Sequence, residues 1–176
     1  NGNYEFPANC MLVAAMNPCP CGNYPDVEKC SCTPGQIQHY LGKISQPFLD
    51  RIDICAEAPR TEYEMLGKTG GTTSAQMREM VCCARRVQAE RYRGTEIRWN
   101  SMLGVKELDL YCKLGKEEKK LMEKAFHSLG LTARTYHKIL KTARTIADLE
   151  GEEQVQASHL SEAVEYRMLN KKYWGR

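Results

Sequence analysis

A chain of 176 residues with 42% hydrophobic and 27% charged side chains has the composition of a soluble globular protein, with room for one ordinary domain or two small ones. No segment approaches the roughly 18 consecutive apolar residues of a membrane span, and the first residues lack a secretion signal, so we expect a cytoplasmic protein with no membrane partner. The formal net charge of +3 is too small to indicate a nucleic-acid-binding protein by itself.

The first predicted element is a buried strand at residues 10–16, a short apolar run that ends at an Asn-Pro turn. A second apolar run predicts another strand at residues 52–56. Between the two runs, Thr33 and Pro34 have the pattern of a helix N-cap followed by Pro, which predicts a short helix through residue 41. The expected fold class is therefore an α/β fragment, the end of a parallel sheet, followed by an all-α part.

The second half of the chain has helical periodicity. We expect a domain at 1–58, a linker at 59–73 and a bundle of four or five helices at 74–176. The linker contains Gly-Lys-Thr, but it lacks the earlier glycine of a Walker A motif, because position 62 is Glu. The strongest predicted helix begins after Thr132 and ends at Gly151.

The odd total of nine cysteines argues for reduced thiols over a secreted disulfide framework. Four of them cluster at 19–32, as Cys19-x-Cys21 and Cys30-x-Cys32. Four thiolates so close together suit tetrahedral Zn²⁺. A loop with so few apolar side chains also needs something other than a hydrophobic core to hold it folded. The C-x-C spacing is tighter than in most structural zinc sites, so reduced or disulfide-linked pairs are the alternative.

Three polar residues are candidates for contacts with nucleotide phosphates. Asn17 follows the first predicted strand and could position a water near a γ-phosphate, although a simple Asn-Pro turn explains it as well. Arg51 precedes the second strand and could reach a phosphate on a neighbouring subunit or pair with an adjacent Asp. Arg134 lies in the first turn of its helix, where a cation is unfavourable unless an anion binds, but it could also be an ordinary solvated arginine.

The basic residues are concentrated in the second part of the chain. Residues 1–60 carry four Lys and Arg against six Asp and Glu, whereas residues 61–176 carry 21 against 16. Six arginines lie between positions 78 and 98, near Tyr92 and Trp99. Such a mixture of cations and rings can hold single-stranded nucleic acid, although most basic helix faces are only solvated.

Several unusual strings carry a family resemblance. Met11-Leu-Val-Ala-Ala-Met-Asn-Pro-Cys-Pro-Cys-Gly22 and Leu49-Asp-Arg-Ile-Asp53, followed by Thr132-Ala-Arg-Thr-Tyr-His-Lys-Ile-Leu140, resemble the magnesium-chelatase-like AAA+ ATPases of the ComM/YifB type. The resemblance covers essentially the whole chain except the linker. It implies that the α/β fragment is the end of an AAA+ core and that the helices are its C-terminal lid.

The resemblance also implies a function. Relatives of this kind form rings, expected to be hexamers, that use ATP with Mg²⁺ and act on DNA. Asn17 matches the sensor 1 position, Arg51 the arginine finger and Arg134 the sensor 2 arginine, while the paired cysteines match an insertion that could bind zinc.

This sequence also departs from the family pattern. The Walker A lysine and Walker B acids are not found in it, so we expect them upstream of Asn1 and expect this part alone to be inactive. Position 46 is Gln where the family would place a small residue. The competing interpretation is a non-enzymatic, zinc-stapled helical module that binds nucleic acid or a partner protein.

Overall fold

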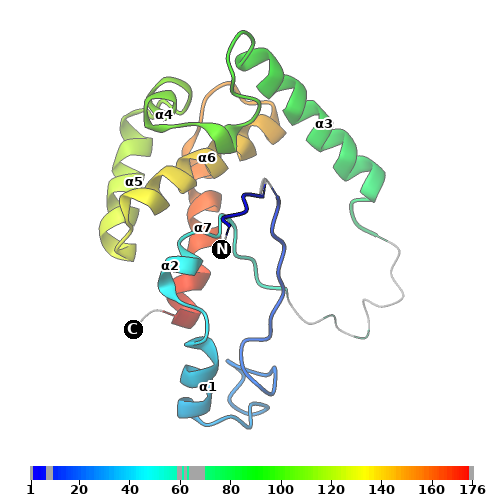
Figure 1. Cartoon of the computed structure of the whole chain (residues 1–176), viewed down its shortest axis with the longest axis vertical. Coiled ribbons are helices and arrows are strands. Elements are labelled where there is room, and N and C mark those ends of the chain that lie inside the picture. Colours follow the sequence, from blue (N-terminus) through cyan, green and yellow to red (C-terminus); the bar gives the residue numbers. More distant parts are fainter. Residues whose placement is uncertain (1, 7–9, 59–60, 62, 64–69, 175–176) are drawn as a thin grey trace. The chain divides into compact units, whose positions relative to one another are not determined.

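The computed structural model describes residues 2–6, 10–58, 61, 63 and 70–174 (Figure 1). The chain divides into two compact units, Asn1–Ile44 and Ser45–Arg176. Residues 45–58 therefore group with the helical unit. Among the described residues, no helix has the length and apolar character needed to span a membrane.

The first unit consists of irregular segments and one described helix, α1 (Pro34–Leu41). Thr33 forms a capping box with Gln36: its hydroxyl accepts the backbone N–H of Gln36 (3.3 Å), and the Gln36 side chain accepts the N–H of Thr33 (2.9 Å). Pro34 occupies the first turn, where its missing N–H costs nothing. The helix predicted after Thr33 is confirmed.

The second unit is a helical bundle built around one central helix, α6. Buried Leu140, Ala143 and Ile146 of α6 belong to one hydrophobic core with Met122 and Leu160 from two neighbouring helices. Its described helices are α2 (Gln46–Leu49), α3 (Ser74–Arg91), the 3-10 helix η2 (Asn100–Met102), α4 (Val105–Tyr111), α5 (Lys116–Leu129), α6 (Ala133–Glu150) and α7 (Ala157–Trp174). The predicted bundle is confirmed.

Local signals set the ends of the central helices. The Thr132 hydroxyl accepts the backbone N–H of Thr135 (3.2 Å) at the start of α6. Gly130 after α5 and Gly151 after α6 have φ of 60° and 77°, left-handed conformations that only glycine adopts without strain. The predicted boundaries at Thr132 and Gly151 are therefore confirmed.

The predicted α/β sheet fragment is wrong. The described residues contain no β-strand, and the run at 10–16, expected to be buried, leaves Met11 88% and Val13 80% exposed. A strand satisfies its backbone N–H and C=O groups on a neighbouring strand, and the described part of the chain provides no such neighbour for either run. Apolar content alone therefore did not produce a sheet.

The second run instead lies along α7. The backbone N–H of Cys55 donates to the carbonyl of Tyr166 (3.2 Å), and the Arg167 guanidinium donates to the carbonyl of Ile52. A little further on, Lys172 and Tyr173 bind the Glu57 carboxylate at 2.7 and 2.8 Å. One helical side chain and one helical carbonyl thus bind backbone groups of this run, and two further helical side chains hold the Glu57 carboxylate.

A buried carboxylate joins α3, η2 and α6. Asp148, 2% exposed, accepts two hydrogen bonds from Arg91 (2.9 and 2.5 Å), one from Asn100 (2.8 Å) and one from Arg144 (3.1 Å). Asn100 in turn accepts the Tyr92 hydroxyl at 2.6 Å. This network holds three elements in register, and nothing in the sequence pattern indicated it.

Arg144 connects the same network to the loop after α6. Its side chain is almost fully buried, and its two terminal nitrogens donate to the carbonyls of Glu152 (2.5 Å) and Glu153 (2.7 Å). The buried guanidinium is therefore fully hydrogen-bonded as well as ion-paired with Asp148. It fixes the turn from α6 into α7.

Replacing Asp148 with Ala should lower the free energy of unfolding by about 3–5 kcal/mol, because Arg91 and Arg144 would keep their charges in a buried site without a counterion. Urea denaturation followed by circular dichroism measures the change. The matched control Glu123→Ala removes an exposed carboxylate of α5 and should change the stability by less than about 0.5 kcal/mol. Equal stability of the two variants would contradict a structural role for the network.

Candidate functional site

The four clustered cysteines of the first unit converge on one point. Their sulfur atoms all lie within 4.8 Å of one another, with Sγ–Sγ distances of 3.4 Å (Cys19–Cys21), 3.6 Å (Cys21–Cys30) and 3.8 Å (Cys19–Cys30), and Cys32 completes the set. A tetrahedron with zinc–sulfur bonds of about 2.3 Å has edges of about 3.8 Å. All four thiols are free, and these separations are far above the roughly 2.05 Å of a disulfide. The four thiols thus have the spacing of a tetrahedral metal site.

Two tight turns of the backbone bring these sulfur atoms together. The N–H of Gly22 donates to the carbonyl of Cys19 (3.0 Å), with Gly22 at φ 78°, where a side chain would be strained. In the second turn the N–H of Cys30 donates to the carbonyl of Asp26 (2.8 Å), while the Asp26 carboxylate accepts the N–H of Lys29 (3.3 Å). The chain thereby folds back so that its two Cys-x-Cys pairs face each other.

The electrostatics of the cluster favour a bound cation. A hydrogen bond from the backbone N–H of Asn23 lowers the pKa of Cys21 to about 5, against the opposing effect of burial. A backbone hydrogen bond from Cys32 acts in the same direction on Cys30, but burial and the thiols of Cys21 and Cys19 outweigh it and raise the pKa of Cys30 to about 11. The sulfurs resist taking on further negative charge, and a dication would remove that resistance.

Asn17 also lies in the first unit, at the start of the cysteine loop. Its exposed side chain packs beside Gly22, 3.6 Å from the position that a Cβ atom would take there. This packing accounts for the position of the Asn17 side chain and is independent of any contact with phosphate. Its sensor 1 role stays a prediction.

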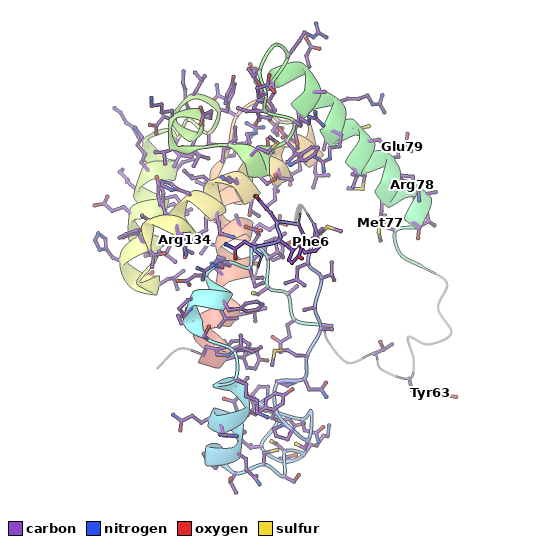
Figure 2. All side chains as sticks on the ribbon, viewed as in Figure 1. Phe6, Tyr63, Met77, Arg78, Glu79 and Arg134 are labelled. Carbon is purple, nitrogen blue, oxygen red and sulfur yellow. The ribbon has the colours of Figure 1, made fainter. Side chains whose placement is uncertain are left out.

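The second unit has a basic cavity that brings Arg51 and Arg134 together. The cavity is about 600 Å³ in volume. Figure 2 shows Arg134 on the N-terminal part of α6, and further lining residues follow it at helical spacing on that helix. The lining residues are Arg51, Leu103, Gly104, Val105, Leu108, Arg134, His137, Lys138 and Lys141.

The lysines of this cavity already donate hydrogen bonds to neighbouring groups of the protein. Lys138 donates to the Arg51 carbonyl (2.5 Å) and to the Asp53 carboxylate (2.6 Å), and Lys141 donates to the Ser101 carbonyl (3.0 Å). Burial lowers the pKa of Lys141, and nearby Lys138 acts in the same direction, against the opposing effect of Asp53. Burial is thus the main cause of this lowered pKa, and the attraction of Asp53 outweighs the repulsion of Lys138.

The two arginines of this cavity form fewer polar contacts than its two lysines. Arg51 is exposed, and its side chain donates to the Pro47 carbonyl (2.6 Å) without forming an ion pair among the described residues. Asp53, one of its two possible sequence neighbours for a salt bridge, pairs with Lys138 instead. Arg134 is also exposed and has no hydrogen-bond or ion-pair partner in the described part of the chain. Both guanidinium groups are thus available to an incoming anion.

The arginine-rich stretch of α3 is a poor stacking platform for nucleic acid. Tyr92 is only 2% exposed and its hydroxyl binds Asn100, so its ring cannot receive a base. Arg91 is held by Asp148, and Arg85 covers the ring of Trp99 at 5.0 Å. The two rings that made this stretch a candidate, Tyr92 and Trp99, therefore already contact other side chains of the protein.

Comparison with known proteins places both units in one family. The family model "Magnesium chelatase, subunit ChlI" matches residues 1–66, and "Magnesium chelatase, subunit ChlI C-terminal" matches residues 71–167. Competence protein ComM of Haemophilus influenzae is 45% identical over 171 residues, which are 96% of this chain and 33% of that protein. The uncharacterized protein YifB of Escherichia coli is 39% identical over 94% of this chain and 32% of its own length. The chain thus spans about a third of the length of the curated relatives that it matches.

Proposed function

This chain belongs to the magnesium chelatase ChlI family, and from that membership we propose that it supplies the phosphate-sensing residues of a ring-shaped ATPase, expected to be hexameric, that remodels DNA. The observation that carries the proposal is the basic cavity in which Arg51 and Arg134, far apart in the sequence, lie on one surface. Guanidinium groups that converge in this way suit the oxygens of a phosphate chain.

The chemistry assigned to these residues is charge stabilisation. During transfer of a γ-phosphoryl group, negative charge spreads over its oxygens, and a positioned arginine stabilises that charge. Arg51 acts as the arginine finger on the nucleotide of an adjacent subunit, and Arg134 senses phosphates as the sensor 2 arginine. Asn17 orients the attacking water as sensor 1. ATP with Mg²⁺ is held by Walker residues that this sequence does not contain.

The cysteine cluster has a structural role in this proposal. Cys19, Cys21, Cys30 and Cys32 bind one Zn²⁺, supported by sulfur separations that match a tetrahedral site. The irregular first unit has one described helix and few buried apolar side chains, so the metal would hold the loop in place of a core.

DNA as the substrate is supported by the family resemblance and by a relative named as a competence protein. The competing function is a non-enzymatic, zinc-stapled module that binds nucleic acid or a partner protein. The two differ in whether the intact protein hydrolyses ATP.

The direct test is ATP hydrolysis by the full-length protein carrying Arg134→Ala. We expect the rate to fall by about 100-fold, the usual cost of removing one group that stabilises transition-state charge. The matched control is Arg98→Ala, which removes an exposed arginine that does not line the cavity and should leave the rate unchanged. Wild-type hydrolysis by Arg134→Ala in an assembled ring would remove the sensor 2 assignment, and no hydrolysis by the intact wild type would favour the non-enzymatic module.

A further inference from the structure

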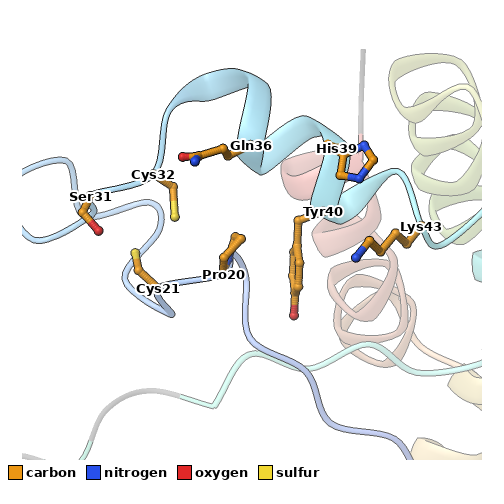
Figure 3. A pocket seen from close by; sticks show the side chains of 8 residues that line it. All are labelled: Pro20, Cys21, Ser31, Cys32, Gln36, His39, Tyr40 and Lys43. Atoms are coloured by element: carbon orange, nitrogen blue, oxygen red, sulfur yellow. The ribbon is translucent and has the colours of Figure 1, made fainter.

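A second cavity lies within the first unit, between the cysteine loop and α1. Its volume is about 440 Å³, within the range of roughly 300–1,000 Å³ of small-ligand sites. Helix α1 contributes Gln36, His39 and Tyr40, spaced so that they share one face, and Lys43 follows just beyond its end. The loop contributes Pro20, Cys21, Ser31 and Cys32 (Figure 3).

The pocket changes in character from one end to the other. Figure 3 shows Cys21 and Cys32 at one end, Lys43 at the other, and Pro20 with Tyr40 between them. The sulfur end is formed by two of the four clustered thiols and contains no cationic side chain. No carboxylate lines the pocket, so Lys43 leaves its opposite end positive. The Tyr40 side chain and Pro20 line the middle.

Two polar groups of this pocket, the Lys43 ammonium and the Tyr40 hydroxyl, are free to meet a ligand. Lys43 is exposed and has no ion-pair partner in the described structure, and the Tyr40 hydroxyl donates no hydrogen bond there. Tyr40 is half-buried, with its side chain on the pocket wall. It thus differs from Tyr92 of the second unit, which is buried and hydrogen-bonded.

We propose that this pocket binds one nucleotide of single-stranded DNA, with the base stacked on Tyr40 and the phosphate beside Lys43. Aromatic rings accept any base, and a neighbouring cation holds the backbone, which is how single strands are bound without sequence preference. Lys43 lies at the end of the pocket opposite the cysteines, so a phosphate beside it leaves the base toward the cysteine end. This inference rests on the proposed function on DNA, and it specifies where a strand touches the protein.

A free phosphate or an acidic peptide fits the pocket less well. One exposed lysine contributes little to holding an anion alone, because an isolated surface charge pair is worth only about 0–1 kcal/mol. Either ligand would also leave the Tyr40 and Pro20 surface unused. A nucleotide uses the ring and the cation together.

The test measures binding of a fluorescein-labelled single-stranded oligonucleotide to the zinc-loaded, full-length protein by anisotropy. Tyr40→Ala should weaken binding by about ten-fold through loss of one stacked base, whereas Tyr40→Phe keeps the ring and should bind as the wild type does. Lys43→Gln should reduce the slope of log K against log salt by about 0.7, the value for one phosphate contact on a single strand. Lys29→Gln, the charge-matched control in the same unit but outside the pocket, should leave that slope unchanged.

The outcomes separate this inference from the function on which it rests. Zinc content equal to that of the wild type shows that each variant keeps its cysteine loop. If the wild type binds single strands and both Tyr40→Ala and Lys43→Gln bind equally well, the pocket assignment is overturned while DNA remains the substrate. If the wild type binds no DNA, the DNA part of the proposed function fails too. The paired bases of a blunt duplex cannot enter the pocket. If Tyr40→Ala also weakens binding of such a duplex, base stacking on Tyr40 is overturned.

Discussion

Arg51→Ala in the full-length protein is expected to lower the rate of ATP hydrolysis by about 10³-fold or more while the ring still assembles. An arginine finger acts only on the charge that develops during phosphoryl transfer, so its loss should slow the reaction without weakening assembly. Arg51 is suited to this role because it is exposed, lines the basic cavity with Arg134 and forms no ion pair among the described residues. Steady-state hydrolysis and size-exclusion chromatography measure the two effects.

Two further measurements define what Arg51 does. Arg51→Lys keeps a positive charge but loses the planar fork, so it should recover only a small part of the lost rate. When Arg51→Ala protomers are mixed with the wild type, the rate of ATP hydrolysis should fall by more than the dilution of wild-type subunits explains. The reason is that each altered subunit disables the nucleotide site of its neighbour. Hydrolysis at the wild-type rate by assembled Arg51→Ala rings would refute the assignment.

Removal of zinc is expected to unfold the cysteine loop. We predict close to one equivalent of zinc per chain by elemental analysis under reducing conditions, and loss of the loop structure when a chelator removes it. The expected effect is large, because structural zinc contributes about 10–16 kcal/mol of binding free energy in zinc-finger peptides. Limited proteolysis within residues 19–32 measures the unfolding.

Cys21→Ser tests the same site without a chelator. It removes the thiol with the most lowered pKa of the cluster and should reduce bound zinc well below one equivalent. Cys10→Ser is the matched control, because Cys10 is an exposed free thiol outside the cluster and its loss should leave zinc content unchanged. A metal-free wild-type protein whose loop resists protease as well as the zinc-loaded form does would end the proposal.

Helix boundaries and the cysteine cluster were readable in the sequence because their causes are local. Thr33 and Thr132 each cap a helix by accepting an N–H three residues ahead, and Gly151 ends α6 through its own backbone conformation. Turns within a short loop likewise bring Cys19 and Cys30 together. These features depend on residues close together in the chain, whose identities are visible as a pattern.

Other features depended on partners that lie far away in the sequence. The runs at 10–16 and 52–56 have the composition of strands, but a strand also needs a neighbour to receive its hydrogen bonds, and the described structure provides none. Only the packing of α3 against α6 showed that Arg91 and Arg144 share Asp148 in the core. The convergence of Arg51 with Arg134 on one cavity was equally a product of tertiary packing. The sequence by itself determined what each residue can do and where the helices end, whereas the folded structure decided which distant residues meet, since contacts between distant residues depend on how the whole chain packs.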